Sequence, residues 1–171
     1  MDALIAIYRR IDNWLHCARL YGGGLLLIRL LMAYEYGNAG LKKFNGSNWF
    51  GKFQDDFIFP FNVIPVDISW FLATWFEILG AVGLLLGLFT RFWAFTLIIL
   101  SIVAISGVHW PAEWSSLGEL WDGYRITAKN GSGNYRVPLL FIAMLIPLMV
   151  SGAGKLGVDS YLAKRFLKSN A

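Results

Sequence analysis

The sequence has very few of the residues that usually hold metals, form disulfides or carry out acid–base chemistry. It contains one cysteine, Cys17, and two histidines, His16 and His109. A single cysteine excludes a disulfide framework and any zinc or iron–sulfur site built from several cysteines. No Ser–His–Asp or Cys–His nucleophilic set is evident among so few side chains. The usual residues of acid–base and nucleophilic catalysis are therefore sparse in this chain.

Charged residues are also scarce. Only 15% of the 171 residues are charged, whereas 57% are hydrophobic and 16% are aromatic. A soluble domain of this length could not bury so much apolar surface, so the composition indicates that lipid replaces water around much of the chain. The formal net charge is +4, and no Lys/Arg-rich block with interleaved aromatic residues suggests a nucleic-acid partner.

The first twenty residues lack the features of a cleaved secretory signal. Arg9 and Arg10 interrupt the apolar core, and no small-residue cleavage site follows. The pattern instead predicts a basic amphipathic helix over residues 1–20 on the cytoplasmic leaflet. A soluble helix packed against the rest of the protein is the alternative. The apolar side chains at helical spacing are Leu4, Tyr8, Ile11, Leu15 and Ala18.

Four apolar segments approach the ~20 residues that a helix needs to cross a bilayer. They predict an all-α fold, a four-helix transmembrane bundle within a domain of residues 21–156, followed by a basic cytoplasmic tail over 157–171. The segments lie at about 22–41, 69–88, 92–108 and 137–152. Two long loops, 42–68 and 109–136, join them and are rich in Trp, Phe and Tyr, so we expect short interfacial helices there.

The basic residues predict an orientation in the bacterial inner membrane. Arg91 lies in the tight turn between the second and third segments, on the same predicted side as the two termini. Eight Lys and Arg residues fall on that side, mostly in short segments, against six on the side of the long loops. The positive-inside tendency therefore places both termini in the cytoplasm and both long loops outside.

Three ionisable residues lie inside the apolar segments: Arg29, Glu35 and Glu77. Antiparallel spans bring Glu35 and Glu77 to a similar depth, about 9 and 12 Å from the outer ends, with Arg29 roughly 9 Å deeper. An unpaired carboxylate in lipid costs several kcal/mol, so we expect all three to face the bundle interior. Three arrangements are open. Arg29 bridges both acids while Lys42 caps Glu35, or one acid stays protonated, or a cation, metal or polar substrate lies between them.

Asn38, Lys42 and His109 are expected to line the way into this polar site from the outside. Asn38 and Lys42 share a helix stripe with Glu35, and His109 ends the third span. Two carboxylates and an imidazole would suit iron, zinc or copper, although a single interfacial histidine is more often a hydrogen-bonding residue. A haem-ligand role for His109 is a further, weaker reading, because no second histidine lies near it.

Two glycine patterns in the sequence carry structural expectations. Gly80, Gly83 and Gly87 have the spacing that lets helices approach closely in lipid. The GAGKLGVD segment near the C-terminus suggests a phosphate-binding loop, but Leu156 replaces the hydroxyl residue that should follow the lysine and no strand precedes the segment. A helix stop at Gly152 and Gly154 explains this segment better.

The arrangement of several of these motifs resembles the DoxX family of membrane proteins. The motifs are an arginine in the first span, GLKK at its end, EILG followed by LLLGLFTRFWA, and a closing GAGKLGVDSYL, together spanning about residues 22–162. The segments HWPAEW, ELWDGY and GNYRVPLL further resemble the HvfX branch. The resemblance implies a four-helix membrane fold, with relatives in thiosulfate:quinone oxidoreductase, in redox or thiol-stress complexes, and near copper-binding modified peptides.

The function expected from these observations is a small redox-associated membrane subunit with an intramembrane polar site for a quinone, metal or proton. Glu35 and Glu77 would handle protons or a cation, and Arg29 would tune their charge. The alternative is a non-catalytic membrane partner, an anchor for soluble enzymes, or an exporter linked to copper-binding peptide biosynthesis. Expected partners are the bilayer, soluble or membrane redox or biosynthetic proteins, and a second copy of the chain.

Overall fold

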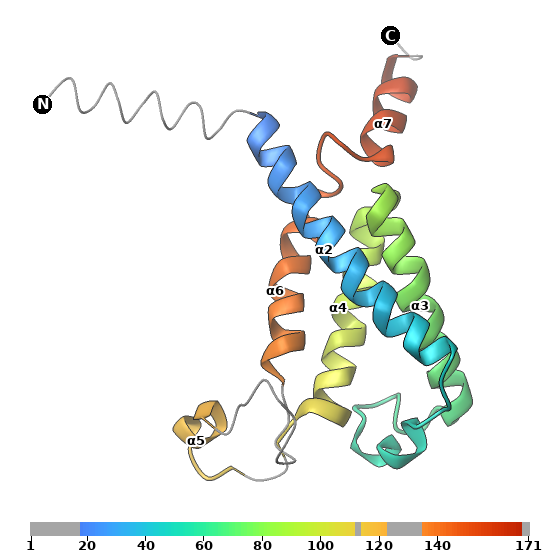
Figure 1. The fold of residues 1–171 in the computed structure, drawn as a ribbon, viewed down its shortest axis with the longest axis vertical. Helices are drawn as coiled ribbons and strands as arrows, with labels where there is room; N and C mark the ends of the chain where they lie inside the picture. The colour runs from blue at the N-terminus through green and yellow to red at the C-terminus, as the bar shows by residue number, and fades with distance from the viewer. Residues whose placement is uncertain (1–17, 112–113, 123–134, 169–171) are drawn as a thin grey trace, which may run out of the picture.

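The computed structural model describes residues 18–111, 114–122 and 135–168, and within them every regular element is a helix. Four long helices account for most of these residues (Figure 1). They are α2 (Ala18–Phe44), α3 (Val66–Leu86), α4 (Thr90–Ala104) and α6 (Arg136–Ser151). The last turn of α4 widens into a π-helix, η3 (Ile105–His109). The shorter elements are η1 (Phe50–Lys52), η2 (Gln54–Asp56), α5 (Leu117–Asp122) and α7 (Val158–Lys168).

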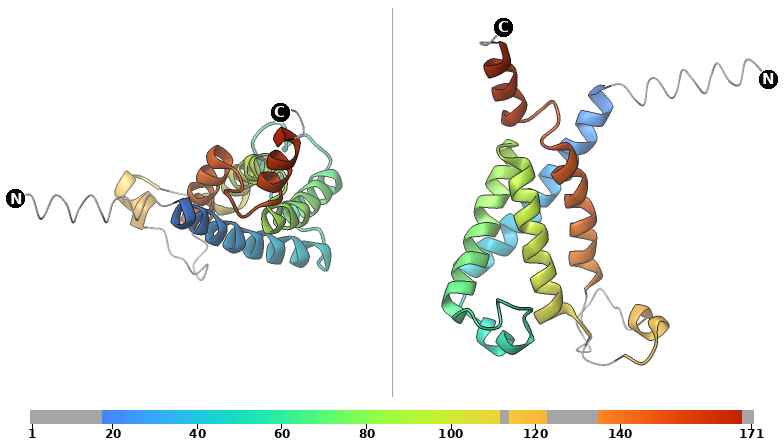
Figure 2. Two further views of the ribbon diagram at one scale, coloured as in Figure 1. Left: turned by 90° about the horizontal axis from the view of Figure 1, so that it is seen from above. Right: turned by 180° about the vertical axis from the view of Figure 1, so that it is seen from behind.

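The four long helices alternate in direction and pack as a bundle (Figure 1). Helix α2 lies diagonally across the others, and the start of α2, the α3–α4 turn and α7 share one end of the molecule. Helices α3 and α4 meet at that turn and spread apart toward the opposite end, where η1, η2 and α5 lie (Figure 2). We call the first the turn end and the second the loop end.

The helices occur where the apolar segments predicted them, within a few residues at each boundary. By length and composition, Val66–Leu86 and Thr90–His109 could each cross a membrane. Helix α6, with 16 residues, is shorter than a usual span, and α2 is longer but carries internal charges. The predicted amphipathic helix over residues 1–20 lies almost entirely outside the described residues, and α7 forms within the predicted basic tail.

The core lies where the four helices meet. Its fully buried members include Met32 of α2, Leu84 of α3, Leu97 of α4 and Leu145 of α6, all with 0% exposure. The outward faces are also apolar, which is unusual for a surface in water. Each long helix contributes large exposed hydrophobic side chains, for example Leu27, Phe71, Phe95 and Leu140. This inside-and-outside apolar pattern fits a protein surrounded by lipid.

Glycines on α3 allow the neighbouring helix to pack closely, as their spacing predicted. A Cβ on Gly83 would lie 2.1 Å from the Trp93 ring of α4, and a Cβ on Gly80 would lie 3.1 Å from the Leu97 side chain. On the other side of α3, a Cβ on Gly40 of α2 would lie 2.7 Å from Ile78. The absence of side chains at these positions therefore sets the distances of α4 and α2 from α3.

Replacing Gly83 with alanine is expected to lower the free energy of unfolding by about 1–3 kcal/mol, because the added methyl group overlaps the indole of Trp93. Gly23→Ala is the matched control, since no atom lies within 4 Å of the added methyl group and alanine favours helix. Unfolding by SDS titration in mixed micelles, followed by circular dichroism, measures both. Equal stability of the two variants would contradict the close packing at Gly83.

The turn between α3 and α4 is held by residues from the far end of the chain. Gly87 ends α3 in the left-handed conformation (φ 65°), with the backbone hydrogen bonds of a Schellman motif: Gly87 N–H to Leu84 O, and Leu88 N–H to Gly83 O. Both oxygens of Asp159 accept backbone N–H groups at the start of α4, from Phe89 at 2.8 Å and Thr90 at 3.0 Å. Asp159, on the first turn of α7, thus caps α4 across the fold.

Candidate functional site

Arg29 is fully buried at the turn end, at 1% exposure, and it is surrounded by backbone carbonyl groups. Its Nε–H donates to Leu84 O at 2.9 Å and its Nη2 donates to Leu85 O at 3.2 Å. Its Nη1 donates to Ala153 O at 2.7 Å and to Leu156 O at 3.2 Å. The negative end of the α3 dipole, the carbonyls of the α6–α7 link and the charge of Asp159 together stabilise the guanidinium. We call this group of contacts the arginine clasp.

The clasp corrects the expected bridge between Arg29 and the two acids. Arg29 does face the interior, but its donors are taken by carbonyl groups and it does not contact Glu35 or Glu77. The carbonyls at a helix C-terminus have no partners within the helix, so a buried arginine can satisfy them without any acid. Gly87 and Gly157 are needed here, because a Cβ at either would lie 2.8–3.1 Å from the guanidinium.

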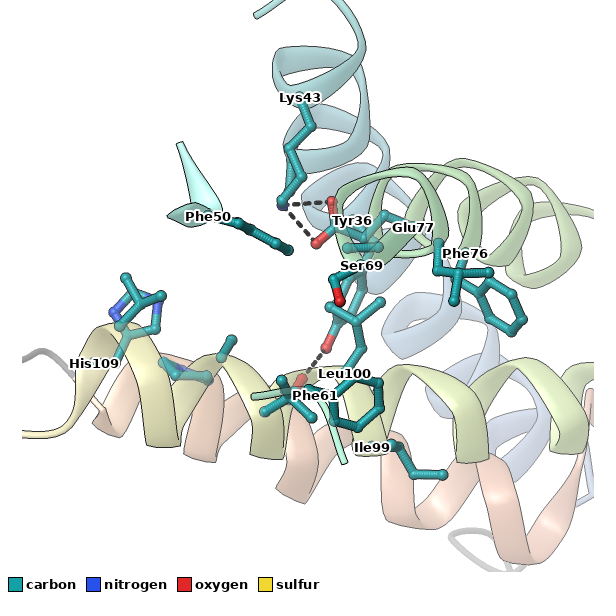
Figure 3. Close-up of a pocket in the computed structure, with 18 of the residues that line it drawn as sticks. Tyr36, Lys43, Phe50, Phe61, Ser69, Phe76, Glu77, Ile99, Leu100 and His109 are labelled. Carbon is teal, nitrogen blue, oxygen red and sulfur yellow. Dashed lines mark hydrogen bonds and ion pairs between the residues drawn. The ribbon is translucent and has the colours of Figure 1, made fainter. Parts of the chain in front are cut away.

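Glu77 pairs with a lysine instead. Lys43 Nζ lies 2.8 Å from Oε1 and 2.7 Å from Oε2 of Glu77, and the exposures of the two side chains are 15% and 5% (Figure 3). Lys42, which was expected to cap Glu35, is exposed. The rotation of α2 about its axis turns Lys43, and not Lys42, toward the bundle interior. The inward-facing residues of α2 follow at steps of three and four: Leu25, Arg29, Met32, Tyr36, Gly40 and Lys43.

The hydroxyl groups of Tyr36, Ser69 and Ser101 line the same cavity as this ion pair. Ser101 Oγ donates to Leu97 O at 2.9 Å, so the Tyr36 hydroxyl donates to Ser101 Oγ at 2.6 Å. Ser69, on the first turn of α3, is 7% exposed, and its hydroxyl has no hydrogen-bond partner among the residues that the structure describes. A buried hydroxyl without a partner costs free energy and is rare, so a ligand at this position would satisfy it.

These polar groups line a cavity of about 600 Å³ between the helices at the loop end. Figure 3 shows Lys43 and Glu77 on one side and Tyr36, Ser69 and His109 also lining it. The rest of the wall is apolar and aromatic. It includes Trp49, Phe50, Phe57, Phe61, Phe76, Leu100 and Phe141. A mostly apolar cavity of this size with a few convergent polar groups is the usual form of a small-molecule site.

The residues expected at one site are divided between the two ends of the bundle. Glu35 and Glu77 line the cavity, as does His109 at its rim. Glu35 is half-buried and makes no hydrogen bond or ion pair within the described part of the chain. Arg29 and the exposed Arg91 lie at the turn end. Asn38 and Lys42 do not line the cavity.

Comparison with known proteins agrees with this architecture. The DoxX family model matches residues 24–110, about half of the chain. A protein of Haemophilus influenzae, described as an uncharacterized protein, is 39% identical over 143 residues, which cover 84% of this chain and 85% of the relative. The chain belongs to the DoxX family. No solved structure matches it. As a DoxX-family membrane protein, it has a lipid environment that accounts for its apolar outer faces.

Several cavity residues of this DoxX protein were not predicted from the sequence. Lys43 and Tyr36 could have been found from the inward stripe of α2, because both share it with Arg29. Ser69 and Ser101 have no comparable signal, since single serines in apolar helices usually bond to their own backbone. The aromatic wall comes partly from the loop 42–68, whose course over the bundle follows from tertiary packing.

The DoxX cavity does not bring together the expected metal ligands. Among residues 18–111, 114–122 and 135–168, no group of three His, Cys, Asp or Glu side chains is close enough to hold a metal ion. Glu77 is engaged by Lys43 in a two-pronged contact, which occupies the oxygens that a cation would need. These side chains therefore fit the polar end of an uncharged small molecule better than they fit a metal ion.

Proposed function

We propose that this DoxX protein binds a quinone-class lipid in the cavity at its loop end, as a membrane subunit that serves a redox partner. The observation that carries the proposal is the combination of an aromatic-walled cavity of about 600 Å³ with a buried Lys43–Glu77 pair and the unpartnered Ser69 hydroxyl. A quinone head is flat, apolar on both faces and polar only at its two carbonyl oxygens, so it matches that lining.

Each polar group has a defined role in this proposal. The Ser69 hydroxyl donates to one head oxygen, which satisfies an otherwise costly buried group. Lys43 directs two of its three N–H donors at Glu77 and has a third for the ligand. Glu35, which has no partner in the described residues, is the group that exchanges protons at the head.

Access to the cavity is from the surrounding lipid. Leu72 of α3 and Ile99 of α4 both line the cavity, and each is 38% exposed on the outer surface of the bundle. These two helices spread apart toward the loop end (Figure 2). A lipid-soluble ligand can therefore reach the site without passing through water, which is a property that a water-soluble substrate would not need.

A titration with decylubiquinone tests the proposal. We expect saturable quenching of tryptophan fluorescence by the wild type in detergent, since Trp49 lines the cavity. Ser69→Ala should weaken binding about fivefold, equivalent to one hydrogen bond of ~1 kcal/mol, without loss of stability. Thr74→Ala is the control, because its hydroxyl is on the same helix but donates to Trp70 O and does not line the cavity.

The outcome that contradicts the proposal is equally defined. If Ser69→Ala and Thr74→Ala bind the probe as tightly as the wild type, the hydroxyl does not contact a ligand. Trp49→Phe tests whether Trp49 is the residue whose fluorescence is quenched. It should remove most of the quenching but keep an aromatic ring in the wall, so binding should still be detected by equilibrium dialysis. Quenching that persists in Trp49→Phe at the same amplitude would place the probe elsewhere.

The same proposal includes the placement of the protein. It spans the bacterial inner membrane four times, with both termini in the cytoplasm and the cavity in the outer half. Support comes from Arg91, Lys155, Lys164 and Arg165, which lie at the turn end or on α7 beyond it. The motifs HWPAEW, ELWDGY and GNYRVPLL support an HvfX-like branch, with soluble or membrane redox or biosynthetic proteins and a second copy of the chain as partners.

A further inference from the structure

A second cleft lies at the turn end, far from the cavity at the loop end. Its volume is about 740 Å³, and it is formed by the start of α4, the link between α6 and α7, and one face of α7. The GAGK segment provides one wall, in which Gly152 (φ 75°) and Gly154 (φ 69°) have positive φ angles that favour glycine. This is the segment whose sequence suggested a phosphate loop, and it lines a cleft although it lacks that fold.

Two cationic side chains line this cleft, and no acid in the described residues pairs with them. They are Arg91 on the first turn of α4 and Lys155 after the glycines, and both are exposed. A Cβ on Gly152 would lie 3.4 Å from Arg91 Nε, so the glycine leaves room beside the guanidinium. The arrangement resembles the pockets in which basic residues near a membrane surface hold anionic head groups.

The one acid in the cleft is already engaged. Asp159 lines the cleft, but both its oxygens accept backbone N–H groups, from Phe89 and Thr90. Its carboxylate therefore stabilises the N-terminus of α4, and it forms no ion pair with either cation in the described residues. An anion from outside the chain is the partner that Arg91 and Lys155 lack.

Two exposed apolar side chains also line the cationic cleft. Phe89 is 67% exposed and Phe92 is 52% exposed, and both line the cleft. A small soluble phosphate compound would leave these two aromatic rings exposed, whereas the acyl chains of a phospholipid would cover them. Phosphate chemistry is shared by both ligands, and the neighbouring rings favour the lipid.

We propose that this cleft binds the phosphate head group of an anionic phospholipid, held by Arg91 and Lys155 with its acyl chains against Phe89 and Phe92. The site is independent of the proposed quinone cavity, because the two have no lining residue in common. Bound lipid would bridge α4 and α7 at the turn end. It is a structural lipid site of the kind that fixes a helix bundle in its membrane.

Native mass spectrometry of the purified protein with added lipid tests this site. The wild type should retain one phosphatidylglycerol in preference to phosphatidylcholine of the same chain length. Arg91→Gln/Lys155→Gln should weaken phosphatidylglycerol binding about 25-fold, since each cation near an anionic head group contributes about fivefold. Lys164→Gln/Arg165→Gln removes the same charge from α7 at exposed positions outside the cleft, and should leave binding unchanged.

Several outcomes would overturn the proposal. Equal loss in both double variants would mean non-specific attraction, and full binding by Arg91→Gln/Lys155→Gln would mean that the lipid lies elsewhere. Arg91→Lys/Lys155→Arg keeps both charges and should keep binding, which guards against a loss caused by misfolding. Inorganic phosphate and glycerol 3-phosphate are tested as soluble alternatives to the lipid. Saturable binding of either, without retention of phosphatidylglycerol, would assign the cleft to a soluble phosphate compound.

Discussion

Replacing Arg29 with methionine is expected to lower the free energy of unfolding by about 4 kcal/mol, the largest effect of any substitution outside the cavity. The change removes four hydrogen bonds from a charged donor and leaves the buried carbonyl of Ala153 and the partly buried carbonyls of Leu85 and Leu156 without that donor. An unsatisfied buried acceptor costs about 1–3 kcal/mol, and lipid offers no replacement donor. The turn end should loosen before the loop end.

SDS titration followed by circular dichroism measures this effect. Arg29→Lys keeps the charge but cannot reach all four carbonyls from one nitrogen, so its stability should be intermediate. Arg165→Met is the control at an exposed position on α7 and should change stability by less than about 0.5 kcal/mol. If Arg29→Met and Arg165→Met unfold at the same SDS concentration, the arginine clasp does not stabilise the fold.

Glu77→Leu is expected to destabilise the protein by about 3 kcal/mol, whereas the double variant Lys43→Met/Glu77→Leu should return close to wild-type stability. The single change leaves the ammonium of Lys43, at 15% exposure, without its carboxylate. Breaking a buried pair costs more than replacing both members by apolar side chains of similar size, which is often neutral. Coupling between the two positions is therefore the signature of the pair.

Ligand binding separates a functional ion pair from a structural one. The double variant recovers the fold but lacks the polar head-group contacts, so its affinity for decylubiquinone should fall at least tenfold, as expected for losing a charge-assisted hydrogen bond. Phe71→Leu, at an exposed position on the outer face of α3 that does not line the cavity, controls for general effects of altering this helix. A stable double variant that binds the probe normally would show that the pair only fastens α2 to α3.

The same pair also distinguishes the two functions considered for the chain. A non-catalytic membrane partner needs Lys43 and Glu77 only for packing, so its interactions with other proteins should persist in the stable double variant. A quinone-binding subunit loses its ligand in that variant while keeping its fold. Measuring both properties on one purified sample identifies the role of the cavity.

The amino-acid sequence determined the helical elements and which charges face inward. Apolar runs of near-membrane length predicted α2, α3, α4 and α6, because backbone groups in lipid must be satisfied within helices. The cost of a charge in hydrocarbon predicted that Arg29 and Glu77 face inward, as both do. The glycine spacing on α3 predicted close helix packing, since a missing side chain is visible in the sequence itself.

Only the tertiary structure decided which groups those charges meet. Arg29 binds carbonyls that are 55 to 127 residues away in the chain, and every residue has a carbonyl, so no pattern of residue types could reveal them. The choice of Lys43 over Lys42 depended on the rotation of α2, where one residue turns the side chain by about 100°. The cavity itself exists because α3 and α4 diverge from a shared turn, and such an angle between helices comes from packing across the whole bundle.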